Sequence, residues 1–423
     1  MICGRRVWNY VVAILWMACS LLGFSKDIAA LPSVSSLEEC SAQILETTEA
    51  WVPENQPTAR HRGAKSIPER AIELPGFVDP KSKGFVRHGI VLGPDGKFDA
   101  VFNPAAFVAK DPATNRERVY LVVRGEQNVE GAWKRRSLPF LYSSEDGLHF
   151  RLESEAPIFT PTESFELIGG IEDPRYADLR LQPYIDTVTG ETFDGAIFYT
   201  AFDGKTARIA AAVFNHSNPR VFKKIGLVFN DADVSLNPVV PGNPAWTKSP
   251  SMLQYRHPET GKIVNVLYAG EGNHEHGGIM AMTSDKPFGW KWPSEAGPVI
   301  QTREDYYDSR LVESAFKPVI APLPKNLQER TNEKDGIYLS LHGDAPPKGY
   351  QVGFRIFSLK NPTGTPLYES TGPYLSPEES WEIEGQVGKV VFASGFVEFR
   401  GRAIIYYGAA DKYIGAASAP IVP

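Results

Sequence analysis

The sequence predicts an all-β fold built from five similar units. Beyond residue 98, short runs rich in Val, Ile, Tyr and Phe alternate with turns of Gly, Asp, Asn and Pro, a pattern typical of short antiparallel strands. The 37 Gly and 34 Pro residues are too many helix breakers for long helices. An aromatic-led strand also recurs at intervals of 79, 69, 70 and 68 residues, at Tyr120, Tyr199, Tyr268, Tyr338 and Tyr406.

The near-constant spacing predicts how these units are arranged. Each aromatic strand is followed by a turn and a strand of small residues, as at 210–214 and 278–282. Five all-β units at such a period are typical of blades placed around an axis. We therefore predict a five-bladed β-propeller over residues 98–423. The alternative, a β-sandwich, gives no reason for the period.

A short amino-terminal segment is predicted to precede the propeller. Ser36 and Glu39 resemble a capping box, and apolar residues on one helical face predict a packing helix over residues 36–47. Residues 53–75 are rich in Pro, Arg and Glu without periodicity, which indicates a wrapping chain. Residues 31–97 are thus expected to form a helical and wrapping segment.

The first residues have the order of an export signal. Arg5 and Arg6 precede an apolar stretch from Tyr10 to Phe24, and small residues follow it. This stretch is shorter than the roughly 20 apolar residues of a transmembrane helix. We therefore predict a cleaved signal peptide over residues 1–30 and an exported protein, periplasmic or extracellular, rather than a retained anchor.

The three cysteines bear on the same segment. Cys19 allows a lipoprotein signal, but Trp16 and Met17 stand where that signal has small aliphatic residues, so lipidation is the less favoured reading. After cleavage only Cys40 remains, which excludes an intrachain disulfide and a cysteine metal site.

Composition excludes several classes of protein. A hydrophobic fraction of 42% and an aromatic fraction of 11% supply a core that disordered chains lack. The net charge is -6, from 44 basic and 50 acidic residues, and no basic run could follow a phosphate backbone. We predict no nucleic-acid partner, and no membrane contact apart from an uncleaved signal anchor.

A polar residue closes each aromatic strand, and strand ends of a radial fold converge near the axis. Taken singly, each is equally explained as a turn residue or an inter-blade salt bridge. Together they predict a polar pocket with two cations, if the histidine is protonated, and three carboxylates. In chain order they are Arg124, Asp203, Glu271, His342 and Asp411.

The sequence bears on two kinds of ligand, a metal ion and a sugar. A metal is not expected, because His274 and His276 would face opposite sides of a strand and glycines around them indicate a loop. Flat aromatic rings can stack on a sugar, although aromatic residues more often belong to a core. The candidate platforms are Trp246, Trp290, Trp292, Tyr306, Tyr307 and Trp381.

The sharpest local signal is the run from Gly169 to Arg175. Pro174 should push Asp173 out of the helical region into an extended or turn conformation, which can aim its carboxylate inward. Beside Arg175 this carboxylate is expected to be ionised in a structural pair, unless burial or substrate raises its pKa toward that of a general acid. The residues alone leave both roles open.

A series of short motifs runs from about Asn103 to Asp411. In chain order they are Asn103-Pro104-Ala105, Arg124, Ser144-Glu145-Asp146-Gly147, Gly170-Ile171-Glu172-Asp173-Pro174-Arg175, Tyr199-Thr200-Ala201-Phe202-Asp203-Gly204, Lys248-Ser249-Pro250, Tyr306-Tyr307-Asp308-Ser309, His342-Gly343, Glu384-Gly385 and Tyr406-Tyr407-Gly408-Ala409-Ala410-Asp411. In this order, and with the five-fold period, the sequence resembles glycoside hydrolase family 130, the β-mannoside phosphorylases and related β-mannosidases.

The resemblance implies a five-bladed propeller that cleaves β-mannosides with inversion of the anomeric centre. It makes Asp173 the general acid, whose proton reaches the glycosidic oxygen through a sugar hydroxyl in the family's mannoside phosphorylases. It also implies that Asn103, Arg124 and Asp308 hold the mannosyl unit. His342 and Asp411 are assigned to the same substrate pocket.

The attacking group decides the reaction. A phosphorylase needs cations to hold phosphate, whereas an inverting hydrolase needs a second carboxylate to activate water. The resemblance places Arg208 and Lys248 as phosphate ligands, so we predict phosphorolysis to mannose 1-phosphate, with inorganic phosphate as co-substrate and no other cofactor. Export favours the alternative, a secreted β-mannosidase, because the phosphorylated sugar is retained only inside a cell. The base would then be Glu172, Glu271, Asp308 or Asp411.

Departures from the family pattern imply altered substrate contacts. Leu341 stands where the family usually has Tyr, Gly388 replaces an Asn, and residues 215–217 replace a Ser-Asp turn. Two further alternatives remain open: a non-catalytic carbohydrate-binding propeller, and a propeller that serves as a protein-interaction scaffold.

Overall fold

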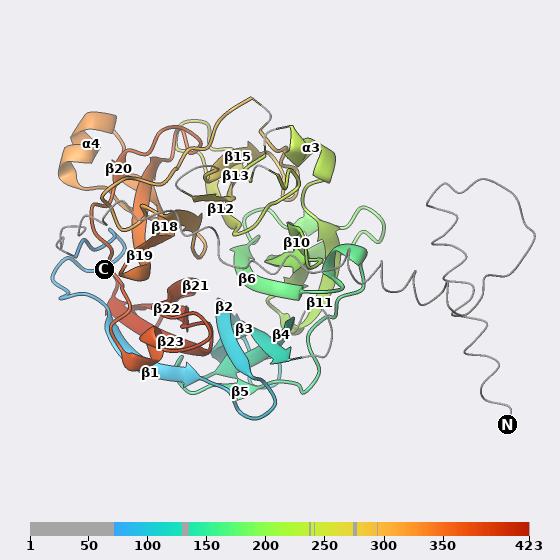
Figure 1. Cartoon of the computed structure of the whole chain (residues 1–423). Coiled ribbons are helices and arrows are strands. Elements are labelled where there is room, and N and C mark those ends of the chain that lie inside the picture. Colours follow the sequence, from blue (N-terminus) through green and yellow to red (C-terminus); the bar gives the residue numbers. More distant parts are fainter. Residues whose placement is uncertain are drawn as a thin grey trace, which may run out of the picture. The chain divides into compact units, whose positions relative to one another are not determined.

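A computed structural model describes residues 72–128, 135–236, 238–240, 242–273, 277–293 and 295–422. The predicted signal peptide, the predicted helix 36–47, all three cysteines and His274 to His276 lie outside the described residues. The described chain is nearly all β, which confirms the predicted fold class (Figure 1).

The amino-terminal half of the described chain forms one eight-stranded sheet. Two antiparallel groups make up this sheet, and a single parallel pair, Ser137 with Gly170, joins them. The first group contains β2 (Ala100–Lys110), β3 (Glu117–Asn128), β4 (Arg135–Ser144) and β5 (Arg151–Leu152). The second contains β6 (Gly170–Asp178), β9 (Gly195–Phe202), β10 (Ala207–Asn215) and β11 (Asn218–Leu227).

Three further antiparallel sheets follow, and a two-stranded ribbon extends the second group. The three-stranded sheet contains β12 (Ser251–Arg256), β13 (Ile263–Ala269) and β15 (Met280–Ser284). The six-stranded sheet contains β14 (Glu271–Asn273), β16 (Leu311–Ser314), β17 (Val319–Pro322), β18 (Asp335–Ala345), β19 (Gly349–Ser358) and β20 (Tyr368–Glu369). The four-stranded sheet contains β21 (Val391–Phe399), β22 (Arg402–Ala409), β23 (Tyr413–Pro420) and β1 (Val86–Leu92). The ribbon is β7 (Tyr184–Ile185) with β8 (Thr192–Phe193).

Strand β1 joins the two ends of the described chain, because it pairs with the last strand, β23. It falls within residues 31–97, for which the sequence predicts a wrapping segment. The sheets lie around a common centre (Figure 1). The two groups of the eight-stranded sheet meet there, because β2 contacts β6, and strands of other sheets join them: β2 contacts β21, and β6 contacts β12.

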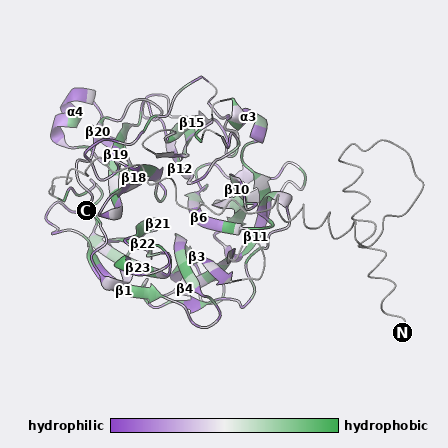
Figure 2. Ribbon diagram, viewed as in Figure 1, coloured by the Kyte–Doolittle hydropathy of each residue, from purple (hydrophilic) through white to green (hydrophobic). Residues whose placement is uncertain are grey.

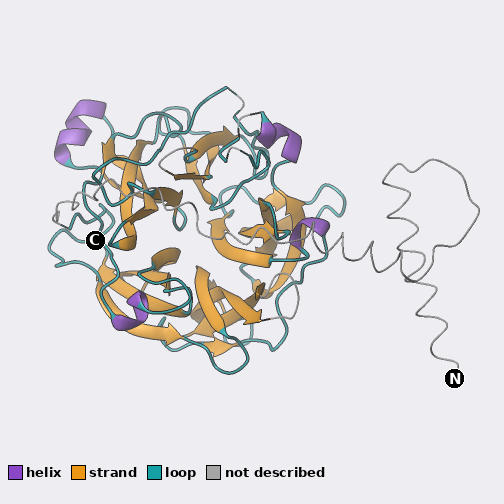
Figure 3. Cartoon of the chain, in the orientation of Figure 1, coloured by secondary structure: helices purple, strands orange, loops and turns teal. Residues whose placement is uncertain are grey.

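Helices are short and lie outside the sheets (Figure 3). They are η1 (Ser164–Glu166), α3 (Asp231–Ser235), α4 (Lys325–Thr331) and α5 (Ser380–Ile383). Helix α4 is mostly hydrophilic, whereas the strands carry most of the hydrophobic residues (Figure 2). Across the described residues, no helix has the length and apolar character needed to cross a membrane.

The five repeat tyrosines are structural. Each is at most 1% exposed, and four of them donate a phenolic hydrogen bond that fixes a neighbouring segment. The acceptors are the Glu166 carboxylate for Tyr199 and the backbone carbonyls of Pro362, Pro322 and Gly147 for Tyr268, Tyr338 and Tyr406. The regular spacing of these tyrosines, from which the five units are predicted, therefore reflects packing in the core.

Several aromatic residues suggested as sugar platforms also belong to the interior, so that suggestion is wrong for them. Trp290, Trp292 and Tyr307 are 6%, 4% and 3% exposed. Trp290 lies against Phe198 and donates its indole N–H to the Asn265 carbonyl, so neither ring face is open.

Candidate active site

Backbone bulges shape the centre of the molecule. Asn103, Asp173 and Ser249 have φ angles of 47°, 46° and 52°, in the left-handed region, and each precedes a proline. The strand register shifts at the first two of these positions. Asp173 thus lies outside the right-handed helical region, as predicted, and its left-handed φ at a bulge within β6 is a detail that the prediction did not contain. Asn and Asp tolerate left-handed backbone better than other residues with side chains.

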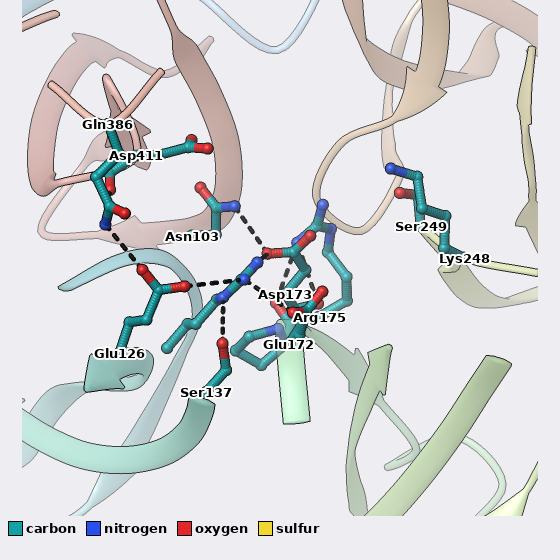
Figure 4. Close-up of polar contacts among 12 residues, drawn as sticks. Asn103, Glu126, Ser137, Glu172, Asp173, Arg175, Lys248, Ser249, Gln386 and Asp411 are labelled. Carbon is teal, nitrogen blue, oxygen red and sulfur yellow. Dashed lines mark hydrogen bonds and ion pairs between the residues drawn. The ribbon is translucent and has the colours of Figure 1, made fainter. Parts of the chain in front are cut away.

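The bulge in β6 turns two consecutive carboxylates, Glu172 and Asp173, toward one guanidinium on β3 (Figure 4). Arg124 donates from Nη1 to Asp173 Oδ1 at 2.9 Å and from Nη2 to Glu172 Oε1 at 3.0 Å. Asn103 Nδ2 donates to the same Asp173 oxygen at 2.7 Å. In a regular strand adjacent side chains would face opposite sides, so this convergence depends on the bulge.

Arg124 is itself held firmly. Its Nε donates to Ser137 Oγ at 2.9 Å, and its guanidinium lies 4.5 Å from the centre of the Phe102 ring. A third carboxylate, Glu126, lies 3.5 Å from Nη2. One guanidinium thus forms ion pairs with three carboxylates.

The pKa values of the two neighbouring carboxyl groups of β6, Glu172 and Asp173, are shifted in opposite directions. Burial raises the pKa of the Asp173 carboxyl, but the charges of Arg124 and Arg175 and the Asn103 hydrogen bond outweigh burial and lower that pKa to about 2. Asp173 is therefore ionised near neutral pH in the resting site.

At Glu172 the effects that raise the pKa outweigh those that lower it. Burial raises its pKa, Arg124 opposes this, and the nearby carboxylates of Asp173 and Glu126 add to the effect of burial. The result is a pKa raised to about 7. Perturbed carboxyl groups at the centre of a β fold are typical of functional sites.

Arg175 does not form the expected structural ion pair with the Asp173 carboxylate. Its Nε donates to the Ala315 carbonyl at 3.0 Å, and its Nη1 donates to the backbone carbonyls of Asp173 and Pro174 at 3.3 Å. Its Nη2 is buried and finds no hydrogen-bond partner within the described residues. Burial lowers the pKa of Arg175, although the charge of Asp173 opposes this.

Lys248 lies on the other side of the site and is already paired. Its Nζ is 2.8 Å from Glu271 Oε2 and 3.4 Å from Glu313 Oε2. Ser249 Oγ donates to the same Glu313 oxygen. Burial raises the pKa of the Glu313 carboxyl, while the Lys248 charge acts in the opposite direction.

His342 is neutral, which corrects the expectation that it adds a second cation. Burial and the charge of Arg175 hold its pKa well below the usual value. Its Nε2–H donates to the Ala393 carbonyl at 2.9 Å, and its ring stacks on Phe392 with centroids 3.7 Å apart. Nδ1 has no partner in the part of the chain that the structure describes. Pairing across β14, β16 and β18 aligns Glu271, Glu313 and His342.

Two of the predicted site residues lie in separate ion-pair clusters. Arg208 binds Asp231 and Asp203, with nitrogen–oxygen distances of 2.9 and 2.7 Å. Asp308 is fully buried and bound by Arg303 at 3.1 Å and by Arg355. Neither Arg208 nor Asp308 shows a contact with Asp173 among the described residues.

Asp411 lies at the edge of the site in left-handed backbone, with a φ of 51°. Gln386 Nε2 donates to the Asp411 carbonyl at 2.9 Å and to Glu126 Oε2 at 2.8 Å (Figure 4). Gly385 lies so close to the Ala410 carbonyl that a side chain would collide with it, so the loop after α5 is seated directly on this edge.

The structure thus brings Asn103, Arg124 and Asp173 into contact, with Lys248 and His342 close enough to act on Asp173 electrostatically. Sequence analysis had no specific role for several residues of the site. Two of them were detectable in principle: Glu313 from its register beside His342, and Ser249 from the repeated pattern of a left-handed residue before proline. The residues without a predicted role are Glu126, Ser137, Ser249, Glu313 and Gln386.

Within the described residues, no group of three or more His, Cys, Asp or Glu side chains is arranged to hold a metal ion. The chemistry that the arrangement offers is acid–base chemistry by paired carboxylates. Buried cations beside them offer binding of hydroxyl or anionic groups.

The chain resembles known enzymes that act on mannosides. It is 40% identical over 84 residues to the β-1,2-mannobiose phosphorylase of Thermoanaerobacter sp. (strain X514), a match that covers 20% of this chain and 28% of that enzyme. It is 30% identical over 109 residues to the 1,2-β-oligomannan phosphorylase of the same organism, covering 24% of this chain and 36% of the relative. The matches therefore span well under half of these relatives.

A solved structure shares the fold over most of the chain. It comes from work on family 130 mannoside phosphorylases and on the glycoside hydrolases among them that target β-1,2-mannosidic linkages in Candida mannan. It has a TM-score of 0.61 and 22% identity, and the match covers 82% of this chain and 99% of that chain. Residues 81–422 also match the profile of family 130, described as β-1,4-mannooligosaccharide phosphorylase. The chain therefore belongs to glycoside hydrolase family 130.

Proposed function

We propose that the protein is an exported, inverting enzyme that cleaves β-mannosides by phosphorolysis and releases mannose 1-phosphate. The observation that carries this proposal is the buried Asp173 carboxylate, held by Asn103 and Arg124 on a left-handed bulge. The family's description and the names of the two curated relatives support a phosphorylase of mannosides. Export rests on the signal pattern in residues 1–30.

We infer a five-bladed β-propeller as the frame of this site. The described strands support it, because apart from the ribbon of β7 and β8 they divide into five antiparallel groups along the chain, and the first strand completes the last group. The one strand out of order is β14, which precedes β15 but pairs in the next group. Contacts among β2, β6, β12 and β21 fit inner strands around an axis. Residues on such strands would share one pocket at the axis.

In the proposed reaction, Asp173 supplies a proton to the glycosidic oxygen as the bond from that oxygen to the anomeric carbon breaks. A phosphate oxygen forms the new bond to the anomeric carbon from the opposite face. Asn103 and Arg124 are suited to bind hydroxyl groups of the mannosyl unit. Besides Arg124, the cations that act on Asp173 are Lys248 and Arg175, whose Nη2 is unpartnered within the described residues, and we assign these two to phosphate.

Hydrolysis is a second candidate because of one specific observation. Lys248 is neutralised by Glu271 and Glu313, and Arg208 is bound by two aspartates, so neither cation is free to attract an anion. A carboxylate beside Lys248 would then activate water, as inverting hydrolysis requires. In that case mannose rather than mannose 1-phosphate is released.

One assay tests both candidates. The mature protein is incubated with β-1,2- and β-1,4-mannobiose, with and without phosphate, and the products are separated. Phosphate-dependent formation of mannose 1-phosphate supports the proposal. Release of mannose at a rate that ignores phosphate makes the protein a hydrolase, and absence of turnover in both buffers favours a carbohydrate-binding protein.

The acid is tested with Asp173→Asn, which preserves size and hydrogen bonding. We expect turnover to fall by about 10²–10⁴-fold, the usual contribution of general acid catalysis. The control is Asp186→Asn, whose ion pair with Lys223 lies outside the site. Wild-type turnover in Asp173→Asn would remove the acid assignment.

A further inference from the structure

The charges around Arg124 do not balance. Its guanidinium contacts Asp173, Glu172 and Glu126 at 2.9, 3.0 and 3.5 Å. A second buried cation, Arg175, acts on Asp173 through its charge but donates only to backbone carbonyls. Lys248 is occupied by its own carboxylates, Glu271 and Glu313. Three ionised carboxylates beside Arg124 and Arg175 would leave one uncompensated negative charge, which a buried site disfavours. The resting cluster is therefore expected to retain a proton.

The hydrogen bonds indicate which carboxyl group retains it. Asp173 accepts from both Asn103 and Arg124. Glu126 accepts from Gln386 at 2.8 Å and lies near Arg124. Glu172 accepts from Arg124 alone among the described residues, so its anion is stabilised least. The charged groups that act on Glu172 are Arg124 and Glu126 of β3, Asp173 of β6 and Lys248 just before β12.

We propose that Glu172 carries the proton consumed by glycosidic bond cleavage and passes it to Asp173 when substrate binds. The proposal rests on the mannoside-cleaving function proposed above. It explains how Asp173, ionised in the resting site, becomes an acid. Glu172 keeps about 17% of its side chain exposed, which leaves it a route to solvent.

Substrate binding supplies the trigger. The two groups that stabilise the Asp173 anion, Asn103 and Arg124, are the same groups suited to bind mannosyl hydroxyls. When Asn103 and the Nη1 group of Arg124 turn to the sugar, Asp173 stays buried but loses its donors, and burial then favours its protonated form. Nη2 of Arg124 stays on Glu172 and stabilises the anion that forms there. The O–H bond of Glu172 breaks as the O–H bond of Asp173 forms.

The remaining steps conserve atoms and charge. Asp173 gives the proton to the leaving oxygen while hydrogen phosphate attacks the anomeric carbon. Hydrogen phosphate loses its own proton as mannose 1-phosphate forms, and a proton returns to Glu172 from solvent. Asn103 and Arg124 then bind the Asp173 anion again. If water is the attacking group, its proton takes the place of the phosphate proton.

The test has two parts. Infrared spectra detect the proton on Glu172, and turnover measurements show whether cleavage of the substrate uses that proton. Infrared difference spectra of the whole mature protein, recorded between pH 5 and pH 9, show the C=O band of protonated carboxyl groups. The wild type should show a component that disappears with a midpoint near pH 7, and Glu172→Gln should lack it. Glu313, whose pKa is also raised, should contribute the same band to both proteins. A matched control is Glu126→Gln, which removes a neighbouring negative charge and should move the midpoint to lower pH.

Turnover of mannobiose completes the test. Gln retains the size of Glu172 and accepts from Arg124, but it has no transferable proton, so turnover should fall by about 10²-fold. Glu172→Asp restores an acid and should recover part of the rate and the decline of activity above neutral pH. An unchanged infrared band in Glu172→Gln, or wild-type turnover and pH profile in that variant, overturns the proposal. If the wild type itself cleaves no mannoside, the proposed function fails, and the infrared comparison still decides whether Glu172 holds the proton.

Discussion

Two buried ion-pair clusters of this molecule differ in how many guanidiniums they hold for each carboxylate. In the Arg124 cluster, one guanidinium serves three carboxylates: Asp173, Glu172 and Glu126. In the Asp308 cluster, two guanidiniums, those of the fully buried Arg355 and of Arg303, bind the fully buried Asp308 carboxylate. A second carboxylate, Glu369, is 44% exposed and lies 2.8 Å from Arg355 and 3.7 Å from Arg303.

The difference shows how environment divides chemistry from structure. A buried carboxylate bound by two guanidiniums is suited to holding its surroundings in place, and Asp308 is such a group. Where three carboxylates lie on one guanidinium, the one with the fewest hydrogen-bond donors, Glu172, retains a proton near neutral pH. Paired acids with divergent pKa values are how proteins separate acid and base roles.

The largest expected effect comes from breaking the Asp308 cluster. Asp308→Asn preserves shape but leaves the fully buried Arg355 with only the partly exposed Glu369 as a negative partner. The loss of one member of a buried pair costs about 3–5 kcal/mol. Urea denaturation of the mature protein measures the free energy of unfolding. The control is Asp231→Asn, whose pair with Arg208 is 49% exposed on the aspartate side, with an expected loss below about 1 kcal/mol. Equal losses in the two variants would contradict this account.

A smaller effect should come from Glu172→Gln, and its sign depends on pH. The pKa of Glu172 is about 7 in the folded protein and 4.5 ordinarily, so unfolding releases a proton between these pH values. The wild-type free energy of unfolding therefore falls as pH rises through this window, by about 3 kcal/mol at 1.36 kcal/mol per pKa unit. The variant lacks this contribution and should exceed the wild type in stability at pH 8 but hardly at pH 4.5. Parallel curves of unfolding free energy against pH would show that Glu172 is not protonated in the fold.

The smallest effect should come from Gln386→Ala at the edge of the Arg124 cluster. The change removes one amide group that donates to Glu126 and to the Asp411 carbonyl, and loss of a hydrogen bond costs about 0.5–1.5 kcal/mol. Thermal and urea unfolding measure the loss. Gln127→Ala is the comparison, because Gln127 donates only to the Lys97 carbonyl outside the site. A loss as large as that of Asp308→Asn would mean that the loop after α5 is part of the core.

Part of the site was accessible from sequence because its residues are neighbours in recognisable motifs. The family resemblance assigned Asn103, Arg124 and Asp173 to one pocket without predicting contacts among them, and in the structure the three side chains are joined by two hydrogen bonds. The partners of Lys248 were not anticipated, because Glu271 and Glu313 belong to other strands and reach it only through sheet pairing. The roles assigned to Arg208, Asp308, His342 and Asp411 stay predictions.

The sequence by itself determined the all-β class, the repeating buried tyrosines and the family, because strand periodicity and motif order are local properties of the chain. Only the tertiary structure decided the left-handed backbone of Asp173, the neutral state of His342 and the unequal sharing of Arg124. These depend on burial and on charges brought together from distant strands. Electrostatic energies in a protein interior are set by distance and solvent exclusion, which no local pattern encodes.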